Sequence, residues 1–73
     1  MKVRNIGSNM TEVEINGKTI LFSYETPVAA NTGSGFVRTE EYYSVTTSKH
    51  INKWLGGAKA KTVPQKDIDN MVN

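Results

Sequence analysis

The chain has 73 residues and a net charge of +2, and it is too short for two ordinary domains. It has no cysteine and a single histidine, His50, so disulfides and thiolate metal sites are excluded and a zinc site lacks ligands. No stretch reaches the length of a membrane span, and the first seven residues lack the apolar run of a signal peptide, so we expect a cytoplasmic protein.

Stability is the first problem for a chain of this size. A domain near this length buries only about 60% of the surface that its unfolded chain exposes. With disulfides and metals excluded, closely packed elements or self-association must supply the remaining stability. Of these two solutions we favour a homo-oligomer.

The basic residues are unevenly distributed along the chain. Residues 1–47 carry four basic and five acidic side chains, whereas residues 48–66 carry five lysines and no acidic side chain. Such a stretch fits an anionic partner. It also fits a solvated lysine surface that keeps the protein in solution, which is the more ordinary explanation.

The N-terminal half predicts an antiparallel sheet. Residues 2–6 are expected to add an edge strand. Asn16-Gly17 separates two alternating runs, residues 11–15 and 18–24, and favours a two-residue hairpin of type I′. That turn places Val13 opposite Ile20, because directly opposed residues share a face. One face then carries Val13, Ile15, Ile20, Phe22 and Tyr24, and the other carries Met10, Glu12, Glu14, Thr19, Leu21 and Ser23.

The middle of the chain predicts a second strand pair. Pro27 cannot donate a ladder hydrogen bond, so the segment around it is an edge, a bulge or a loop. Residues 31–35 form a flexible connector, and residues 36–46 return as a strand rich in aromatic and β-branched side chains. Apolar groups on both sides of that strand indicate burial on both faces, a bulge near Glu40-Glu41, or a dimer contact.

Two short helices are expected to follow. Thr47 or Ser48 is a suitable N-cap, and Ile51, Trp54 and Leu55 form one helical stripe that Gly56-Gly57 ends. Residues 58–62 read as a linker. Pro64 suits the start of the second helix, whose stripe is Ile68, Met71 and Val72. The fold class is therefore α+β, with three to four antiparallel strands and two C-terminal helices packed on one face of the sheet. We expect that face to be the one that carries Val13 and Ile20.

No group of residues predicts catalysis, a cofactor or a metal site. His50 lies near Thr47 and Ser48, but a helix cap explains those hydroxyls. Glu40 and Glu41 are adjacent on a strand and so point to opposite faces. Glu12 and Glu14 share a face, where two solvated charges are a simpler explanation than a bound cation. We therefore expect no enzyme.

The segment 48–57 predicts the best candidate binding surface. Lys49 and Lys53 lie one helical turn apart, and nearby lysines extend the positive charge towards residue 61. Trp54 completes the apolar stripe, so it is expected in the core rather than stacked on a base. The candidate surface consists of Tyr42, Lys49, His50, Asn52, Lys53, Lys59 and Lys61.

Two blocks of the sequence, residues 22–30 and 44–55, carry a resemblance to a known group. From Val3-Arg4-Asn5 to Val63-Pro64-Gln65, the chain resembles small uncharacterised proteins encoded by tailed bacteriophages and prophages. The resemblance implies a viral protein that acts in the cytoplasm of a bacterial host. It implies no catalytic or cofactor-binding residues.

Three functions stay open from the sequence. The first is a phage-encoded accessory protein that binds a host or phage macromolecule, with a protein as the favoured partner. The second is a small nucleic-acid-binding protein that uses Lys49, Lys53, Lys59 and Lys61. The third is an oligomeric binder of a nucleotide or another small ligand, with its pocket between subunits.

Overall fold

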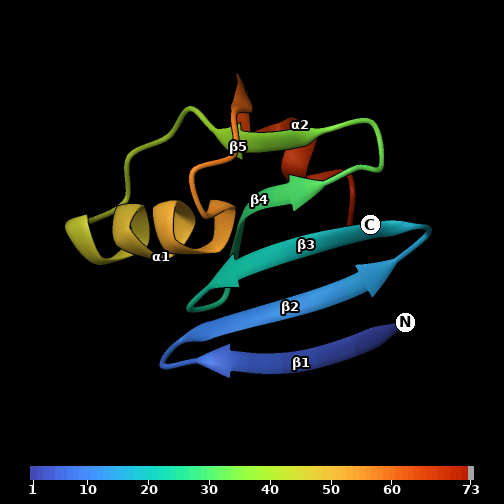
Figure 1. Ribbon diagram of the computed structural model, residues 1–73, viewed down its shortest axis with the longest axis horizontal. Coiled ribbons are helices and arrows are strands. Elements are labelled where there is room, and N and C mark those ends of the chain that lie inside the picture. Colours follow the sequence, from blue (N-terminus) through green and yellow to red (C-terminus); the bar gives the residue numbers. More distant parts are fainter. Residues whose placement is uncertain (73) are drawn as a thin grey trace.

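The computed structural model describes residues 1–72, which form a single sheet with two helices (Figure 1). The elements in chain order are β1 (Lys2–Gly7), β2 (Met10–Ile15), β3 (Lys18–Ser23), β4 (Thr26–Asn31), β5 (Phe36–Thr39), α1 (Val45–Leu55), β6 (Ala60–Val63) and α2 (Gln65–Asp69). The α+β class is confirmed, but the sheet has six strands rather than three to four.

The strands lie in the sheet in the order in which they occur in the chain. Strands β1 to β5 form an antiparallel meander, and β6 then pairs parallel with β5. A parallel pair needs a crossover connection, and α1 supplies it. Residues 58–62, predicted as a linker, thus contain the start of an edge strand. The predicted edge strand at residues 2–6 is confirmed as β1.

The β2–β3 hairpin has the register that Asn16-Gly17 predicts. Val13 lies opposite Ile20, and Ile15 lies opposite Lys18. Asn16 and Gly17 have φ angles of 52° and 77°, the positive values that a type I′ turn requires. A two-residue turn leaves no freedom to slip, so this register positions every side chain of both strands.

A bulge in β4 follows from Pro27. The pairing with β3 shifts between Leu21, which faces Ala29, and Phe22, which faces Pro27. The extra residue is Val28, and both Val28 and Ala29 are fully buried in the same core cluster. Of the three interpretations offered for Pro27, the structure has the bulge.

The N-cap of helix α1 lies three residues before Thr47 and four before Ser48, the two predicted caps. Ser44 is the cap, and its side chain accepts a hydrogen bond from the backbone N–H of Thr47. Thr47, predicted as a cap, lies inside the helix and is buried. The C-terminal end is as expected, since Gly56 takes the left-handed conformation and its N–H donates to the carbonyl of Asn52.

The helix α1 covers the face of the sheet that was expected to be mostly polar. Ile51 and Leu55 pack against a cluster that contains Met10, Leu21 and Ala29. The prediction that the Trp54 segment lies on the Val13 and Ile20 face is therefore wrong. Met10 and Leu21 supply enough apolar surface to bind the helix although Glu12 and Glu14 share their face.

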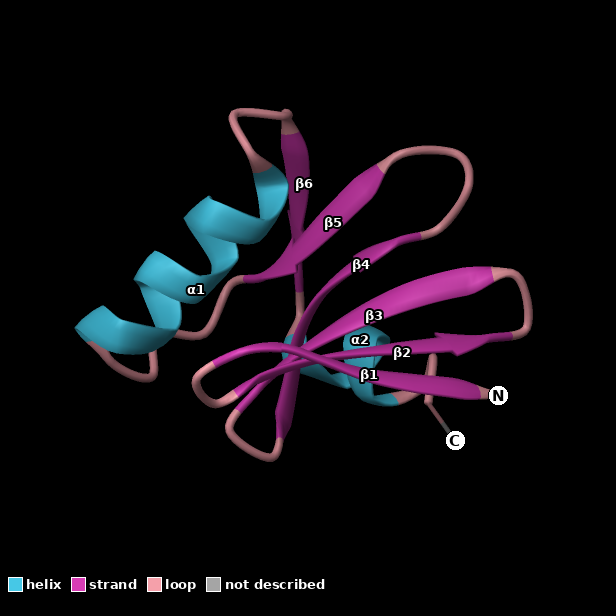
Figure 2. Cartoon of the chain, turned by 60° about the horizontal axis from the view of Figure 1, so that its bottom comes forward, coloured by secondary structure: helices cyan, strands magenta, loops and turns pink. Residues whose placement is uncertain are grey.

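The helix α2 lies on the opposite side of the sheet (Figures 1 and 2). Its Ile68 is fully buried but is not part of the cluster under α1. The side-chain amide of Gln65 donates to the carbonyl of Pro27, which ties α2 to β4. The prediction of two helices on one face is wrong, and the sheet instead carries one helix on each face.

The predicted strand 36–46 stops at Thr39 because the helix starts soon afterwards. Phe36 packs edge-on against Trp54 on the α1 side, at a centroid distance of 5.8 Å. Val37, its neighbour in the strand, points to the other face. The apolar groups on both sides of this segment therefore reflect an interior strand with a helix on each face.

Candidate functional site

The outer side of α1 presents a basic surface. Lys49, Asn52 and Lys53 are exposed on the side of the helix that faces away from Ile51 and Leu55. The helix contains no acidic residue. Arg38 of β5, which was not predicted, joins this surface because its guanidinium donates a 3.2 Å hydrogen bond to the Asn52 side chain. We call these four residues, Arg38, Lys49, Asn52 and Lys53, the α1 basic surface.

The other predicted binding residues do not all join the α1 basic surface. Ala60 packs against the cluster under α1, so its neighbour Lys61 points to the opposite face of the sheet. Lys59 is exposed in the turn before β6. Tyr42, which is 70% exposed, lies beyond the other end of the helix. Of the predicted set, Lys49, Asn52 and Lys53 thus share the α1 basic surface, while Tyr42, Lys59 and Lys61 lie at three other places.

The predicted binding residue His50 faces the sheet. Its Nδ1 lies 2.8 Å from the Ser23 hydroxyl, which also lies 3.0 Å from the Thr47 hydroxyl. Its ring lies 6.0 Å from that of Tyr24. A serine this close to a histidine has the spacing of a nucleophile and its base, but Ser23 is 2% exposed and no substrate can reach it. The three side chains instead join α1 to β3.

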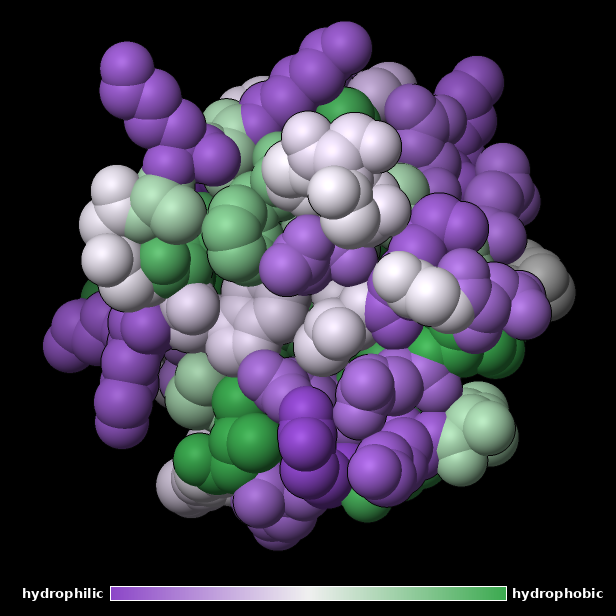
Figure 3. All heavy atoms as spheres, turned by 45° about the vertical axis from the view of Figure 1, so that its right-hand side comes forward, coloured by the Kyte–Doolittle hydropathy of each residue, from purple (hydrophilic) through white to green (hydrophobic). Residues whose placement is uncertain are grey.

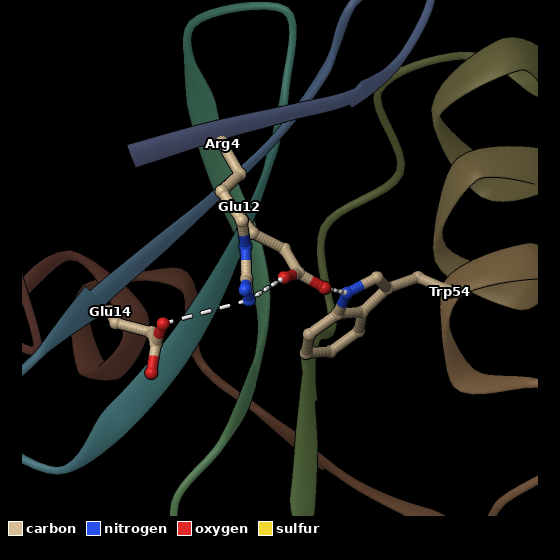
Figure 4. Close-up of polar contacts among 4 residues, drawn as sticks. All are labelled: Arg4, Glu12, Glu14 and Trp54. Carbon is tan, nitrogen blue, oxygen red and sulfur yellow. Dashed lines mark hydrogen bonds and ion pairs between the residues drawn. The ribbon is translucent and has the colours of Figure 1, made fainter. Parts of the chain in front are cut away.

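Trp54 connects α1 to the N-terminal strands on the same face of the sheet. Its Nε1–H donates a 2.7 Å hydrogen bond to the Glu12 carboxylate, which also binds the Arg4 guanidinium at 2.7 Å (Figure 4). Arg4 lies 3.6 Å from the Glu14 carboxylate as well. Glu12 and Glu14, expected as solvated charges, are therefore both paired with a cation, and the sequence pattern gave no indication of the Trp54 contact.

The surface has two shallow hollows, one at each end of the N-terminal strands. One, of about 290 Å³, is lined by Arg4, Glu12, Thr19, Asn31, Phe36 and Trp54. The other, of about 670 Å³, lies at the opposite end of the strands and is lined by Asn5, Asn9, Thr11, Tyr24, Glu25 and Thr26. Both are formed within one chain, whereas the small-ligand hypothesis places its pocket between subunits. That hypothesis stays a prediction.

Exposed apolar side chains are scattered over the surface. On the face drawn in Figure 3, hydrophobic side chains form small patches that hydrophilic ones separate. Tyr42, Tyr43 and Val45 are 70%, 45% and 61% exposed before and at the start of α1. Partial desolvation, followed by the Glu41 and Asp69 carboxylates, raises the pKa of Tyr43 above its ordinary value. Tyr43 is therefore neutral at physiological pH.

Among the described residues there is neither a cluster of potential metal ligands nor a membrane-spanning helix. No three His, Asp or Glu side chains within residues 1–72 lie together in a way that would hold a metal ion. Over the same residues, neither helix is long and apolar enough to span a bilayer.

Comparison with known proteins identifies the family but no activity. Neither the curated proteins nor the solved structures include a match to the chain. A family model described as a family of unknown function, DUF8033, matches residues 1–70. Because this match spans nearly the whole chain, the protein belongs to the DUF8033 family.

Proposed function

We propose that the protein is a non-catalytic binding protein and that the α1 basic surface contacts an acidic surface on a protein partner. The observation that carries this proposal is the absence of acidic side chains from α1, together with the exposure of Lys49, Asn52 and Lys53 along it. A helix face with charges of one sign attracts a partner of the opposite sign.

The geometry of Arg38 supports the same surface. Its guanidinium is held by Asn52, so part of the surface is ordered before a partner arrives. Lys49 and Lys53 make no ion pair with any described residue, and both keep their charge available. Because part of the cationic surface is already ordered, binding a partner costs less conformational entropy.

Site-specific photo-crosslinking in bacterial cells tests the proposal. A photoreactive amino acid at residue 52 should give a discrete adduct, and the same group at Asp67 of α2 should not. The adduct should disappear in the double variant Lys49→Glu/Lys53→Glu because repulsion replaces attraction. The matched control is Lys61→Glu/Lys66→Glu, which changes the net charge equally away from the α1 basic surface and should retain the adduct.

Two results would contradict this proposal. The first is an adduct from residue 52 that survives reversal of both lysines. The second is no adduct from residue 52 in the native host.

We also propose, from the sequence resemblance, that the protein is encoded by a bacteriophage or prophage and acts in the host cytoplasm. A phage accessory protein fits a small chain without a catalytic group of residues. The genes that flank members of the DUF8033 family test this origin. Flanking genes for capsid, tail or phage replication proteins are expected, and their consistent absence would refute it.

Nucleic-acid binding is the second candidate, and one observation favours it. Residues 48–66 carry five lysines without an acidic side chain. Against it, the Trp54 indole is occupied by Phe36 and Glu12 and is not free to stack on a base. Gel shifts with single-stranded and duplex DNA at two salt concentrations decide the matter, since phosphate contacts weaken as salt rises.

A further inference from the structure

The two edges of the sheet are protected to different degrees. β6 forms one edge with only four residues, which include the exposed Lys61, and Pro64 follows it. β1 forms the other edge with six residues and no proline, and its first five residues are exposed. Of its two cations, Arg4 is paired with Glu12 and Glu14, so only Lys2 guards this longer edge. Proteins usually shorten such an edge or guard it with charge or proline.

The hairpin register determines which backbone groups of β1 face outward. Ile15 and Lys18 close a two-residue turn and exchange hydrogen bonds, so odd-numbered residues of β2 bond to β3. Glu12 and Glu14 therefore bond to β1, where they lie opposite Arg4 and Lys2. The N–H and C=O groups of the intervening residues, Val3 and Asn5, then point away from the sheet.

The side chains of β1 form two different faces beside this edge. Lys2 and Arg4 lie on the α1 side, and Arg4 is drawn over β2 towards Glu12 and Glu14, away from the edge (Figure 4). Val3 lies on the other side and is 61% exposed. A strand added at this edge would meet the positive charge of Lys2 on one face and the apolar side chain of Val3 on the other.

The charge pattern disfavours a second copy of this chain as that strand. In an antiparallel β1–β1 pair, Lys2 would face Arg4 of the copy when Val3 lies opposite Val3, and Arg4 would face Arg4 when Val3 lies opposite Asn5. Like charges placed directly opposite are destabilising. A strand that alternates acidic and apolar residues has the complementary pattern. β2 itself has this pattern and already pairs with β1 in the fold, with Glu14 and Glu12 opposite the two cations.

We propose that the β1 edge binds an extended segment of a partner protein that places an acidic residue beside Lys2 and an apolar residue beside Val3, adding a seventh strand to the sheet. The outward groups of Val3 and Asn5 supply the backbone hydrogen bonds. Lys2, which forms no ion pair with any described residue, selects an acidic side chain, and Val3 packs against an apolar one. This interaction is independent of the α1 basic surface.

A capped peptide with the sequence Met-Thr-Glu-Val-Glu-Ile serves as the probe, titrated into ¹⁵N-labelled protein and followed by NMR. The amides of Val3 and Asn5 should shift and become protected from hydrogen exchange. The variant Val3→Pro removes one outward N–H and leaves the bonds to β2 in place, so its spectrum should stay folded while binding weakens roughly tenfold. Val3→Ile retains both the N–H and an apolar side chain and is the matched control that should still bind.

Three outcomes would overturn the proposal. Val3→Pro could bind the peptide as tightly as the unaltered chain. A Met-Thr-Lys-Val-Lys-Ile peptide could bind equally well, which would remove the charge selection. The free protein could already protect the Val3 and Asn5 amides and have the mass of a dimer, which would make a second copy the occupant of the edge.

Discussion

The indole of Trp54 shows how one side chain can join a helix to two strands that are distant from it in sequence. Its ring packs edge-on against Phe36, and its N–H reaches the Glu12 carboxylate at 2.7 Å. Glu12 is at the same time bound to Arg4. The aromatic contact and the charged hydrogen bond therefore act together to hold the C-terminal half of α1 on the sheet.

The variant Trp54→Phe separates these two contributions. It retains a ring beside Phe36 but removes the donor to Glu12, so we expect a loss of about 1–2 kcal/mol in the free energy of unfolding. Urea denaturation followed by circular dichroism measures this loss. Trp54→Ala should be less stable still, and equal stability of Trp54→Phe and the unaltered chain would show that the hydrogen bond adds nothing.

The raised pKa of Tyr43 gives a dependence of stability on pH. A phenol whose pKa is raised holds its proton more tightly in the folded chain than in the unfolded chain. Its contribution to stability is complete below the ordinary value of 10.0 and is lost as pH rises through the raised value. We expect Tyr43→Phe to lessen the loss of stability above pH 10.0, to a small extent because the residue is 45% exposed.

Urea denaturation at a series of alkaline pH values checks the Tyr43 effect. Tyr42→Phe is the comparison variant, since it removes the neighbouring phenol, which is 70% exposed. Identical slopes for the two variants would contradict the assignment to Tyr43.

At the scale of elements, α1 depends on its two ends. Ser44 caps the first turn, and Gly56 ends the helix in the left-handed conformation at φ 59°. Between these ends the helix has few strong helix formers, since Val45, Thr46, Thr47 and Ile51 are β-branched. Caps and burial, rather than intrinsic propensity, therefore stabilise it.

Removal of the N-cap should weaken α1 measurably. We expect Ser44→Ala to lower the free energy of unfolding by about 1 kcal/mol, because the N–H of Thr47 loses its acceptor. Thermal or urea unfolding provides the measurement. Ser34→Ala, in the exposed connector between β4 and β5, removes a serine hydroxyl that caps no helix and should have little effect.

The same elements show what the sequence could and could not predict. Asn16-Gly17 determines the hairpin because the turn preference of these two residues agrees with the alternation of apolar and polar residues on either side. Both features can be recognised in the sequence without knowledge of tertiary contacts. The start of α1 was misplaced because Tyr42, Tyr43 and Val45 have the composition of a strand. β6 was missed because its four residues, with Lys61 in the middle, lack any alternating apolar pattern and pair only through a crossover.

The candidate site was predictable to a similar, partial extent. Helical periodicity correctly places Lys49 and Lys53 together on the outer side of α1. It cannot show that Arg38 approaches Asn52, or that Trp54 reaches Glu12, because both contacts depend on which face of the sheet the helix covers. The hairpin register gave one indication of the face that the helix covers, since it places the apolar side chains of Leu21 and Met10 on the face with Glu12.

At the scale of the whole molecule, the sheet separates two apolar layers. Leu21 and Ile51 belong to the layer under α1, and Ile68 is buried on the opposite side. A small domain has only about 3–5 kcal/mol of stability from its core, so both layers are needed. The homo-oligomer expected from this small core stays a prediction, and light scattering is its measurement.

The two layers should behave independently in a double-mutant cycle. Ile51→Val and Ile68→Val each remove one methylene, with an expected loss of about 0.5–1.5 kcal/mol. The double variant should lose the sum to within about 0.5 kcal/mol, because the sheet lies between the two sites. Ile51→Val with Leu21→Val, two residues of one cluster, is the comparison and should depart from additivity. Coupling of Ile51 with Ile68 as strong as in that pair would contradict the two-layer arrangement.

The parallel pairing of β5 with β6 also has a consequence for biosynthesis. As the nascent chain leaves the ribosome, β1 to β5 emerge in the order in which they pair, so the meander is able to assemble during translation. The outer border of β5 stays open until residues 60–63 have been made and α1 has folded back. A polypeptide truncated before this segment would keep that border available for aggregation, so β5 is covered only after residues 60–63 have been synthesised.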